Sequence, residues 1–143
     1  MKQAALIVAI AYVACTVPAF AAEETILCSM TKKAPGGAAE SFLQKFELDF
    51  DARSVVNVEN WGSGWEETGR GQFVDADDAG ITLEDNALIH TYINRGTGKF
   101  YGEIRRDFSK QERGGSETVS YKQGTVFRGQ CKQLGARPAR NVL

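Results

Sequence analysis

The sequence predicts an all-β domain, an antiparallel up-and-down meander that closes into a small barrel of eight or nine strands, with a β-sandwich as the alternative. Stretches of alternating apolar and polar residues predict strands, and turn-forming residues separate them at the roughly 8–12-residue spacing of barrels and sandwiches. The clearest hairpin is residues 88–107, where two arms rich in β-branched and aromatic residues flank a turn at residues 95–98. We expect Gly98 to have a positive φ in this turn, with Gly96 as a second candidate for one.

The N-terminal segment is typical of a secretory signal peptide. Met1 and Lys2 give a positive start, an apolar run covers residues 4–17, and small residues precede the predicted cleavage after Ala21. The run is shorter than the roughly 20 apolar residues of a membrane span, so we expect none in the mature chain. A lipoprotein anchored through Cys15 is the alternative to a periplasmic or secreted protein. The predicted parts are a signal peptide (1–21), a single β domain (22–132) and a flexible C-terminal tail (133–143).

The strands of the mature chain follow from the same alternation. They are predicted at residues 24–32, 40–50, 54–59, 66–74 and 81–83, in the two arms of the central hairpin, and at 117–122 and 125–132. Segments rich in Gly, Asp, Asn or Ser predict loops or turns at 33–39, 51–54, 60–65, 75–80 and 109–116. Gly69 and Gly71 indicate a bulge or a sharp bend in the fourth of these strands.

The alternation also predicts which side chains fill the interior. The residues expected inside are Phe46, Leu48, Phe50, Ile89, Ile93, Phe100 and Ile104. The residues expected outside are Glu47, Asp49, Asn94 and Arg105, because burying an unpaired charge is costly.

Cysteine usage predicts one disulfide. If Cys15 leaves with the signal peptide, Cys28 and Cys131 remain at the two ends of the domain. Such a pair in an oxidising compartment is most often a disulfide. In an up-and-down barrel with an even number of strands the first and last strands are neighbours, so the bond could cross the closing seam.

The charge balance excludes several classes of partner. The chain has 17 basic and 18 acidic side chains, so neither nucleic acid nor an anionic membrane is an expected partner. The central hairpin is locally basic and residues 75–85 are acidic. A solvated edge is the default explanation for this asymmetry, and a docking surface for an acidic envelope component is the alternative.

The candidate ligand-binding residues are Trp61, Trp65, His90 and Tyr92. The two tryptophans flank a Gly-Ser-Gly segment and could form a platform for a sugar ring or another flat ligand. Tryptophan also commonly closes the end of a small barrel, with its N–H bonded to the backbone, and this interpretation is favoured. His90 could serve as a general base, but no free cysteine or nucleophile motif accompanies it.

The acidic cluster at residues 75–85 resembles the start of a calcium loop. It departs from that loop at the fifth position, Ala79, and at the twelfth, Asn86, where a bidentate Glu is needed. Aspartates also favour β-turns through their own side-chain hydrogen bonds. We therefore expect no metal site and no cofactor.

Residues 93–100 read Ile-Asn-Arg-Gly-Thr-Gly-Lys-Phe, after an early Cys28 and before a closing Gly129-Gln130-Cys131. In this pattern the chain resembles small exported proteins of proteobacteria, in which an Ile-(Asp/Asn)-Arg-x-Thr-Gly hairpin precedes a terminal Gly-x-Cys. The resemblance implies export, a disulfide and a β fold, and it implies no activity.

The leading hypothesis is an exported, non-enzymatic β-barrel domain that binds a small ligand or an envelope or extracellular partner. One alternative is an inhibitor-like module that blocks a hydrolase with an exposed loop such as residues 60–65. Another is a small hydrolase or isomerase that uses His90 with a carboxylate. A concave apolar cavity would favour the ligand-binding barrel. An exposed Trp61 on a projecting loop would favour the inhibitor-like module, and a carboxylate beside His90 inside a pocket would favour the hydrolase or isomerase.

Overall fold

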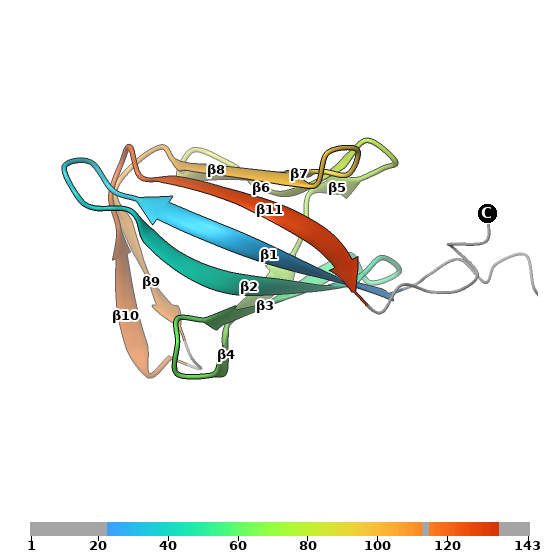
Figure 1. Cartoon of the computed structure of the whole chain (residues 1–143), viewed down its shortest axis with the longest axis horizontal. Coiled ribbons are helices and arrows are strands. Elements are labelled where there is room, and N and C mark those ends of the chain that lie inside the picture. The colour runs from blue at the N-terminus through green and yellow to red at the C-terminus, as the bar shows by residue number, and fades with distance from the viewer. Residues whose placement is uncertain (1–22, 113–114, 135–143) are drawn as a thin grey trace, which may run out of the picture.

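The computed structural model describes residues 23–112 and 115–134, and over these residues the protein is all-β (Figure 1). The described strands are, in chain order, β1 (Glu23–Lys33), β2 (Glu40–Asp49), β3 (Ser54–Asn60), β4 (Trp65–Gln72), β5 (Asp75–Ala76), β6 (Gly80–Asp85), β7 (Ile89–Asn94), β8 (Lys99–Ile104), β9 (Phe108–Glu112), β10 (Glu117–Tyr121) and β11 (Val126–Leu134). The predicted signal peptide lies outside the described residues, as does the predicted tail from residue 135 onward. The described part of the chain contains no helix long and apolar enough to cross a membrane.

One antiparallel sheet of nine strands, in the order β4-β3-β2-β1-β11-β8-β7-β6-β5, curls into a half-barrel (Figure 1). The order follows the chain from β1 to β4 and from β5 to β8, so the predicted meander is confirmed. The first and last strands are neighbours, also as predicted, because β11 returns between β1 and β8. The free edges of the sheet are β4 and β5. The opening of the half-barrel therefore lies between these edges, and the β1–β11 seam is inside the sheet.

The predicted disulfide joins β1 to β11. Cys28 and Cys131 lie directly opposite each other in the ladder of these strands, and their sulfurs are bonded. The Cys28 side chain is 0% exposed and belongs to the hydrophobic core. A disulfide of this kind indicates an oxidising, non-cytoplasmic environment.

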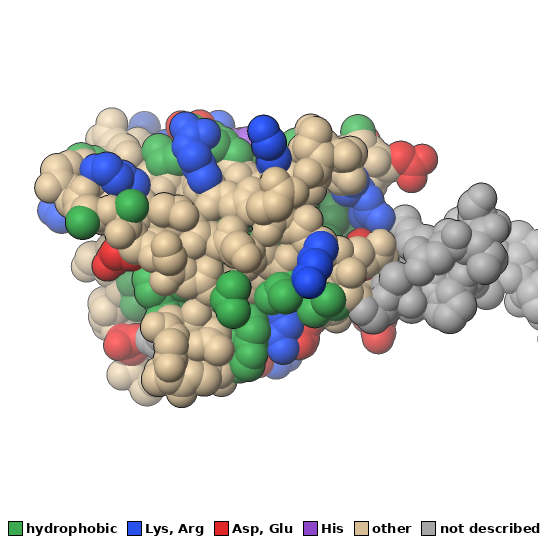
Figure 2. All heavy atoms as spheres, viewed as in Figure 1, with side chains coloured by type: hydrophobic (Ala, Val, Ile, Leu, Met, Phe, Trp, Pro, Cys, Tyr) green, Lys and Arg blue, Asp and Glu red, His purple; other side chains and the backbone are tan. Residues whose placement is uncertain are grey.

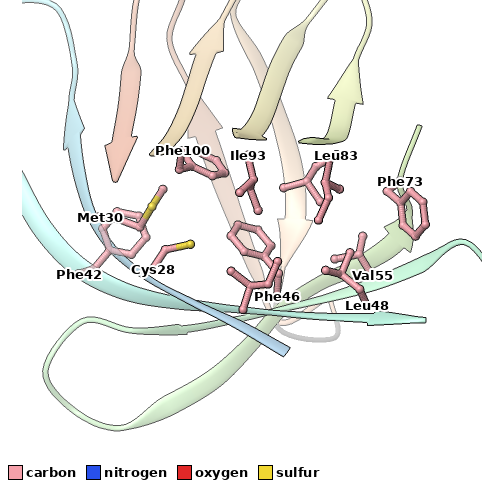
Figure 3. Packing of buried hydrophobic residues seen from close by; sticks show 12 residues of the cluster. Cys28, Met30, Phe42, Phe46, Leu48, Val55, Phe73, Leu83, Ile93 and Phe100 are labelled. Carbon is pink, nitrogen blue, oxygen red and sulfur yellow. The ribbon is translucent and has the colours of Figure 1, made fainter. Parts of the chain in front are cut away.

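The core occupies the concave face of the curled sheet (Figure 3). The predicted interior residues Phe46, Leu48, Ile93, Phe100 and Ile104 are buried. Phe50 and Ile89 are partly buried, and Phe50 packs against the core cluster. Glu47 and Arg105 are exposed, as predicted, whereas Asp49 and Asn94 are half-buried. The Phe46 and Phe100 rings stack with centroids 5.6 Å apart, and this contact joins β2 to β8 across the interior.

The turn of the central hairpin is built by the residues of the Asn-Arg-x-Thr-Gly pattern. The Asn94 side chain accepts hydrogen bonds from the backbone N–H groups of Gly96 and Thr97. Arg95 reaches across to β1, where its guanidinium lies 3.1 Å from a carboxylate oxygen of the buried Glu24. Gly98 has the predicted positive φ, at 75°, whereas Gly96, the second candidate, does not have one. The pattern is therefore explained by the fold, since each of these residues shapes or anchors the turn.

The prediction of a loop at residues 109–116 was wrong in its first half, because β9 extends to Glu112 and pairs with β10. These two strands form a separate hairpin that stands across one end of the half-barrel, at the left in Figure 1. Other strand boundaries differ as well. A two-residue strand, β5, opens the predicted acidic turn. β4 ends at Gln72 instead of residue 74, β6 spans Gly80–Asp85 instead of 81–83, and β11 continues to Leu134, beyond the predicted strand end at 132.

Candidate ligand-binding cavity

A cavity of about 460 Å³ lies between the concave face of the sheet and the β9–β10 hairpin. Its volume is within the 300–1,000 Å³ range of small-molecule sites. The apolar part of its lining comes from seven strands and consists of Phe46, Val55, Leu83, Ile89, Phe100, Phe108 and Phe127. Exposed residues of β4 and Gly115 also line the cavity, so it opens to solvent beside the free edge of the sheet.

Two glycines of β4 account for the empty space. Gly69 and Gly71 oppose Asn57 and Val55 in the β3–β4 ladder, so both glycines face the concave side. A Cβ added at Gly71 would meet no atom within 4 Å, and one at Gly69 would meet only side-chain atoms of Asn57 and Lys110, at 3.9 Å. Between the glycines and the rest of β4 the register shifts, and Thr68 is the extra residue of a β-bulge. The predicted bulge is confirmed, and the space beside it is the cavity.

The Gln44 amide faces the cavity without a partner. Gln44 lies on β2 in a cross-strand row with Cys28 of β1 and Glu59 of β3, and it is 8% exposed. Within the described parts of the chain its side chain makes no hydrogen bond. Its amide atoms are accessible from the cavity, so a polar group of a ligand could bond them.

Four carboxylates also line the cavity, from Glu59, Glu84 and Glu112 and from Glu67 at its rim. Glu112 is 6% exposed, accepts a hydrogen bond from the Tyr121 hydroxyl and lies 3.6 Å from the Lys110 ammonium nitrogen. Glu59 accepts hydrogen bonds from the Trp61 indole N–H at 2.8 Å and from the Thr68 hydroxyl at 3.2 Å. The Glu84 side chain has neither a hydrogen bond nor an ion pair to any residue that the structure describes.

The carboxylates make this part of the interior electronegative. Burial, followed by the hydrogen bond to the Glu112 carboxylate, raises the pKa of Tyr121 well above its ordinary value, and the charges of Glu59 and Glu84 act in the same direction. The hydroxyl therefore stays protonated and donates to Glu112. At the exposed rim, the Arg70 guanidinium donates two hydrogen bonds to the Glu67 carboxylate and thereby lowers its pKa. This carboxylate is therefore ionised, and Arg70 balances its charge.

A smaller cavity of about 230 Å³ adjoins the first and shares Glu59, Glu112, Tyr121 and Phe127 with it. Trp61 lines this smaller cavity and is 42% exposed. Its ring stacks on Phe42 with centroids 4.1 Å apart. Lys32 lies on the other side, with its ammonium nitrogen 5.9 Å from the Phe127 ring centre. Trp61 is thus the one sequence-predicted ligand residue that the structure places at either cavity.

The other three candidates, Trp65, His90 and Tyr92, lie on the outer face of the sheet. The Trp65 ring is 40% exposed and lies under the Lys45 ammonium nitrogen, 4.2 Å away. The His90 Nδ1 is 3.4 Å from an Asp85 carboxylate oxygen, and the Tyr92 hydroxyl donates to the Ala79 carbonyl. Neither cavity is lined by these three residues.

Strand alternation explains this placement. Thr91 lies between His90 and Tyr92 and faces the cavity, so its neighbours must face outward. The expectation that Ile89 and Ile93 point inward already implied an outward His90 and Tyr92. The cavity residues that sequence reasoning missed are Gln44, Asn57, Glu59, Glu84, Thr91 and Glu112. The sequence did contain a signal for them. Polar residues occupy positions that the alternation places on the inner face, and Gly69 and Gly71 lie close together in β4.

The acidic segment at residues 75–85 serves the local turns. One Asp77 carboxylate oxygen accepts hydrogen bonds from the backbone N–H groups of Ala79 and Gly80, and Asp75 accepts one from Ala76. These bonds are the side-chain caps that favour Asp in turns. Over the part of the chain that the structure describes, no three His, Cys, Asp or Glu side chains are placed to hold a metal ion.

Comparison with protein-family models, with curated proteins and with solved structures finds no match to this chain.

Proposed function

We propose that the protein is an exported, non-enzymatic β domain that binds a small ligand in the cavity beneath the β9–β10 hairpin. One observation carries the proposal. The concave face is left empty beside Gly69 and Gly71, and the amide of Gln44, a residue only 8% exposed, faces that space without a partner among the described residues. A void lowers stability, and this cost is removed when a ligand fills the site and bonds the Gln44 amide.

Export to the periplasm or beyond the cell is supported by two independent features. Residues 1–21 have the charge, the apolar run and the small residues of a signal peptide. The Cys28–Cys131 disulfide is a bond that persists in oxidising compartments.

The alternative functions have weaker support. Trp61 does not project freely, because its ring stacks on Phe42 and its indole N–H donates a hydrogen bond to Glu59. The loop is also held by the Asn60 side chain, which accepts hydrogen bonds from the backbone N–H groups of Gly62 and Gly64. An inhibitor would present such a loop to its target. The His90–Asp85 pair lies on the outer face, outside the two cavities, whereas a hydrolase needs its base at a substrate pocket.

Docking to an acidic envelope component also has little support on the face seen in Figure 2. This face carries β11, β1 and β2, and its Lys and Arg side chains are scattered singly and form no continuous basic patch. Scattered surface charges of this kind are screened by salt and contribute little to binding.

Fluorescence of 1-N-phenylnaphthylamine, an uncharged apolar probe, tests the proposal. The emission of the probe should rise when it is titrated with mature protein, because the cavity is lined by aromatic and aliphatic side chains. Gly71→Phe should abolish the rise, since its side chain would point into the empty space and no atom lies within 4 Å of its Cβ.

Ser41→Phe is the matched control, because it adds the same side chain at an exposed position of β2. It should leave the titration unchanged. If Gly71→Phe binds the probe as tightly as the unmodified protein does, the cavity is not the binding site and the proposal is wrong.

A further inference from the structure

We propose that the cavity selects an organic cation, an amine that carries an apolar body, over neutral and anionic molecules of the same shape. This inference rests on the proposed function and adds the chemical class of the ligand. Three features of the lining support it. Some of its carboxylates have no cationic partner, the Gln44 amide lies beside one of these carboxylates, and the Phe46 and Phe100 rings offer an aromatic contact surface.

The charges of the lining do not cancel. Among the residues that the structure describes, four carboxylates, from Glu59, Glu67, Glu84 and Glu112, face two cations, Arg70 and Lys110. Arg70 is held by Glu67 at the rim, and Lys110 lies beside Glu112. Adding the smaller cavity contributes Lys32 and still leaves the carboxylates in excess.

Glu59 and Glu84 are therefore the charges that a ligand could neutralise. Both hydrogen bonds that Glu59 accepts come from uncharged donors, an indole N–H and a hydroxyl, so its negative charge remains. Glu84 has no ion pair within the described residues. A carboxylate that faces a partly enclosed, apolar space attracts a cation more strongly than one in water does.

Gln44 supplies the second, independent observation. It lies directly opposite Glu59 in the β2–β3 ladder, where paired side chains are about 5 Å apart at Cβ. An ammonium group has three donors and no acceptor, so it can bond the Gln44 carbonyl oxygen and the Glu59 carboxylate at once. Phe46, two residues along β2 on the same face, and its stacking partner Phe100 would contact the apolar body.

The same lining disfavours an anion. A ligand carboxylate would be placed near Glu59, Glu84 and Glu112. Of the two cations that line the main cavity within the described residues, Arg70 is paired with Glu67 and Lys110 lies beside Glu112. Like charges at such distances repel, so the anion would have to bind protonated or not at all.

Isothermal titration calorimetry with three probes of one shape tests the inference. The probes are 3,3-diphenylpropylamine, 3,3-diphenylpropanol and 3,3-diphenylpropionate, which carry a cation, a neutral group and an anion on the same body. At pH 7 and low salt the amine should bind about tenfold or more tightly than the alcohol, and the acid more weakly than the alcohol. Glu84→Gln should weaken the amine by about three- to tenfold and leave the alcohol within about twofold.

Glu47→Gln is the matched control, because it removes the same charge from the exposed face of β2 and should leave all three affinities unchanged. If the alcohol or the acid binds as tightly as the amine, or if Glu47→Gln acts like Glu84→Gln, the cation preference is overturned while the cavity remains a binding site. If none of the three probes binds, the proposed function falls as well. Binding that survives Gly71→Phe would place the amine outside the cavity and overturn the inference.

Discussion

The backbone of Gly98 is held in place by hydrogen bonds to Asn94 in its own turn and to Cys131 of β11. Its N–H donates to the Asn94 carbonyl within the turn, and its carbonyl accepts a hydrogen bond from the N–H of Cys131. Its φ is 75°, a value that residues with a side chain rarely adopt. A Cβ at this position would also lie 2.6 Å from the Cys131 carbonyl oxygen. The turn therefore depends on glycine for both conformation and space.

Gly98→Val should destabilise the protein by about 2 kcal/mol or more, because it combines a strained φ with a backbone clash. Gly71→Ala is the control, since Gly71 has open space around it and no positive φ. It should change stability by no more than about 1 kcal/mol. Urea denaturation of both variants gives the comparison. An unchanged midpoint for Gly98→Val would contradict this account of the turn.

Tyr121 predicts a loss of stability in alkali. Its pKa is raised in the folded protein from an ordinary value of 10.0, so its contribution is fully present below about pH 10. Above that pH the unfolded chain loses the phenol proton while the folded protein keeps it. The free energy of unfolding should then fall by up to about 1.4 kcal/mol per pH unit from this group.

Tyr121→Phe isolates this effect, because the variant keeps a ring to stack on Phe108 and cannot ionise. Between pH 9.5 and 11 its stability should fall less steeply than that of the unmodified protein, by up to the slope of one proton. Equal slopes in denaturant titrations would show that the Tyr121 hydroxyl is not held protonated by the fold.

At the scale of elements, the alternation of apolar and polar residues correctly predicts strands in which one face is packed against the core and the other is exposed to solvent. In β2, Phe46 and Leu48 are buried while Glu47 is exposed, as their spacing predicts. The same holds for Ile93 and Phe100 on the arms of the central hairpin. These strands lie inside the sheet, so burial of a single face decides both their conformation and their register.

Alternation failed for β9 because that strand has no apolar face. Its residues from 109 to 112 are polar, and on its inward side Glu112 is satisfied by Tyr121 and Lys110. On the other side Ser109 and Gln111 lie within hydrogen-bond distance of Ser120 and Thr118 across the hairpin. Such partners become visible only when the pairing of β9 with β10 is known.

The cavity was missed for a related reason. Gly69 and Gly71 were correctly associated with a bulge, but whether a missing side chain leaves a void depends on what lies opposite. Met30 occupies the space beside Gly129, whereas nothing fills the space beside Gly71. The sequence of one strand cannot distinguish these two outcomes, because the filling side chain comes from another strand.

The two faces of β2 offer a direct test of the sheet. Leu48→Ala should cost about 2–5 kcal/mol, since Leu48 is buried against the core cluster. Glu47→Ala should stay within about 0.5 kcal/mol, the usual range of a surface position. Thermal or chemical denaturation of the pair provides the measurement. Equal costs, or the reverse order, would mean that the inward face of β2 is wrongly assigned.

At the scale of the whole molecule, the disulfide closes most of the domain into one covalent loop. It joins residues 103 apart in sequence and lies in the middle of the sheet, between the two halves of the meander. In the chain-entropy model a loop of about 100 residues stabilises the folded state by about 4–5 kcal/mol. This is a large share of the 5–15 kcal/mol that a small domain typically has.

Reduction should therefore lower the free energy of unfolding of the mature protein by several kcal/mol, about 4–5 by the entropic estimate. The measurement is urea denaturation with and without reductant, with thiol titration of the unfolded, unreduced protein to verify that Cys28 and Cys131 are bonded. Two free thiols per chain, or the same denaturation midpoint in both conditions, would contradict this role of the bond.

The half-barrel brings the two halves of the meander together around a space that side chains do not fill, and the central claim is that a ligand occupies it. The most direct measurement is a titration of ¹⁵N-labelled mature protein with 1-N-phenylnaphthylamine, followed by ¹H–¹⁵N correlation spectra. The largest shifts should occur at the side-chain amides of Gln44 and Asn57 and at the backbone amide of Thr91, which line the cavity. Shifts confined to the outer face, at Lys45, Trp65 or Tyr92, would contradict the claim, as would a spectrum that does not change.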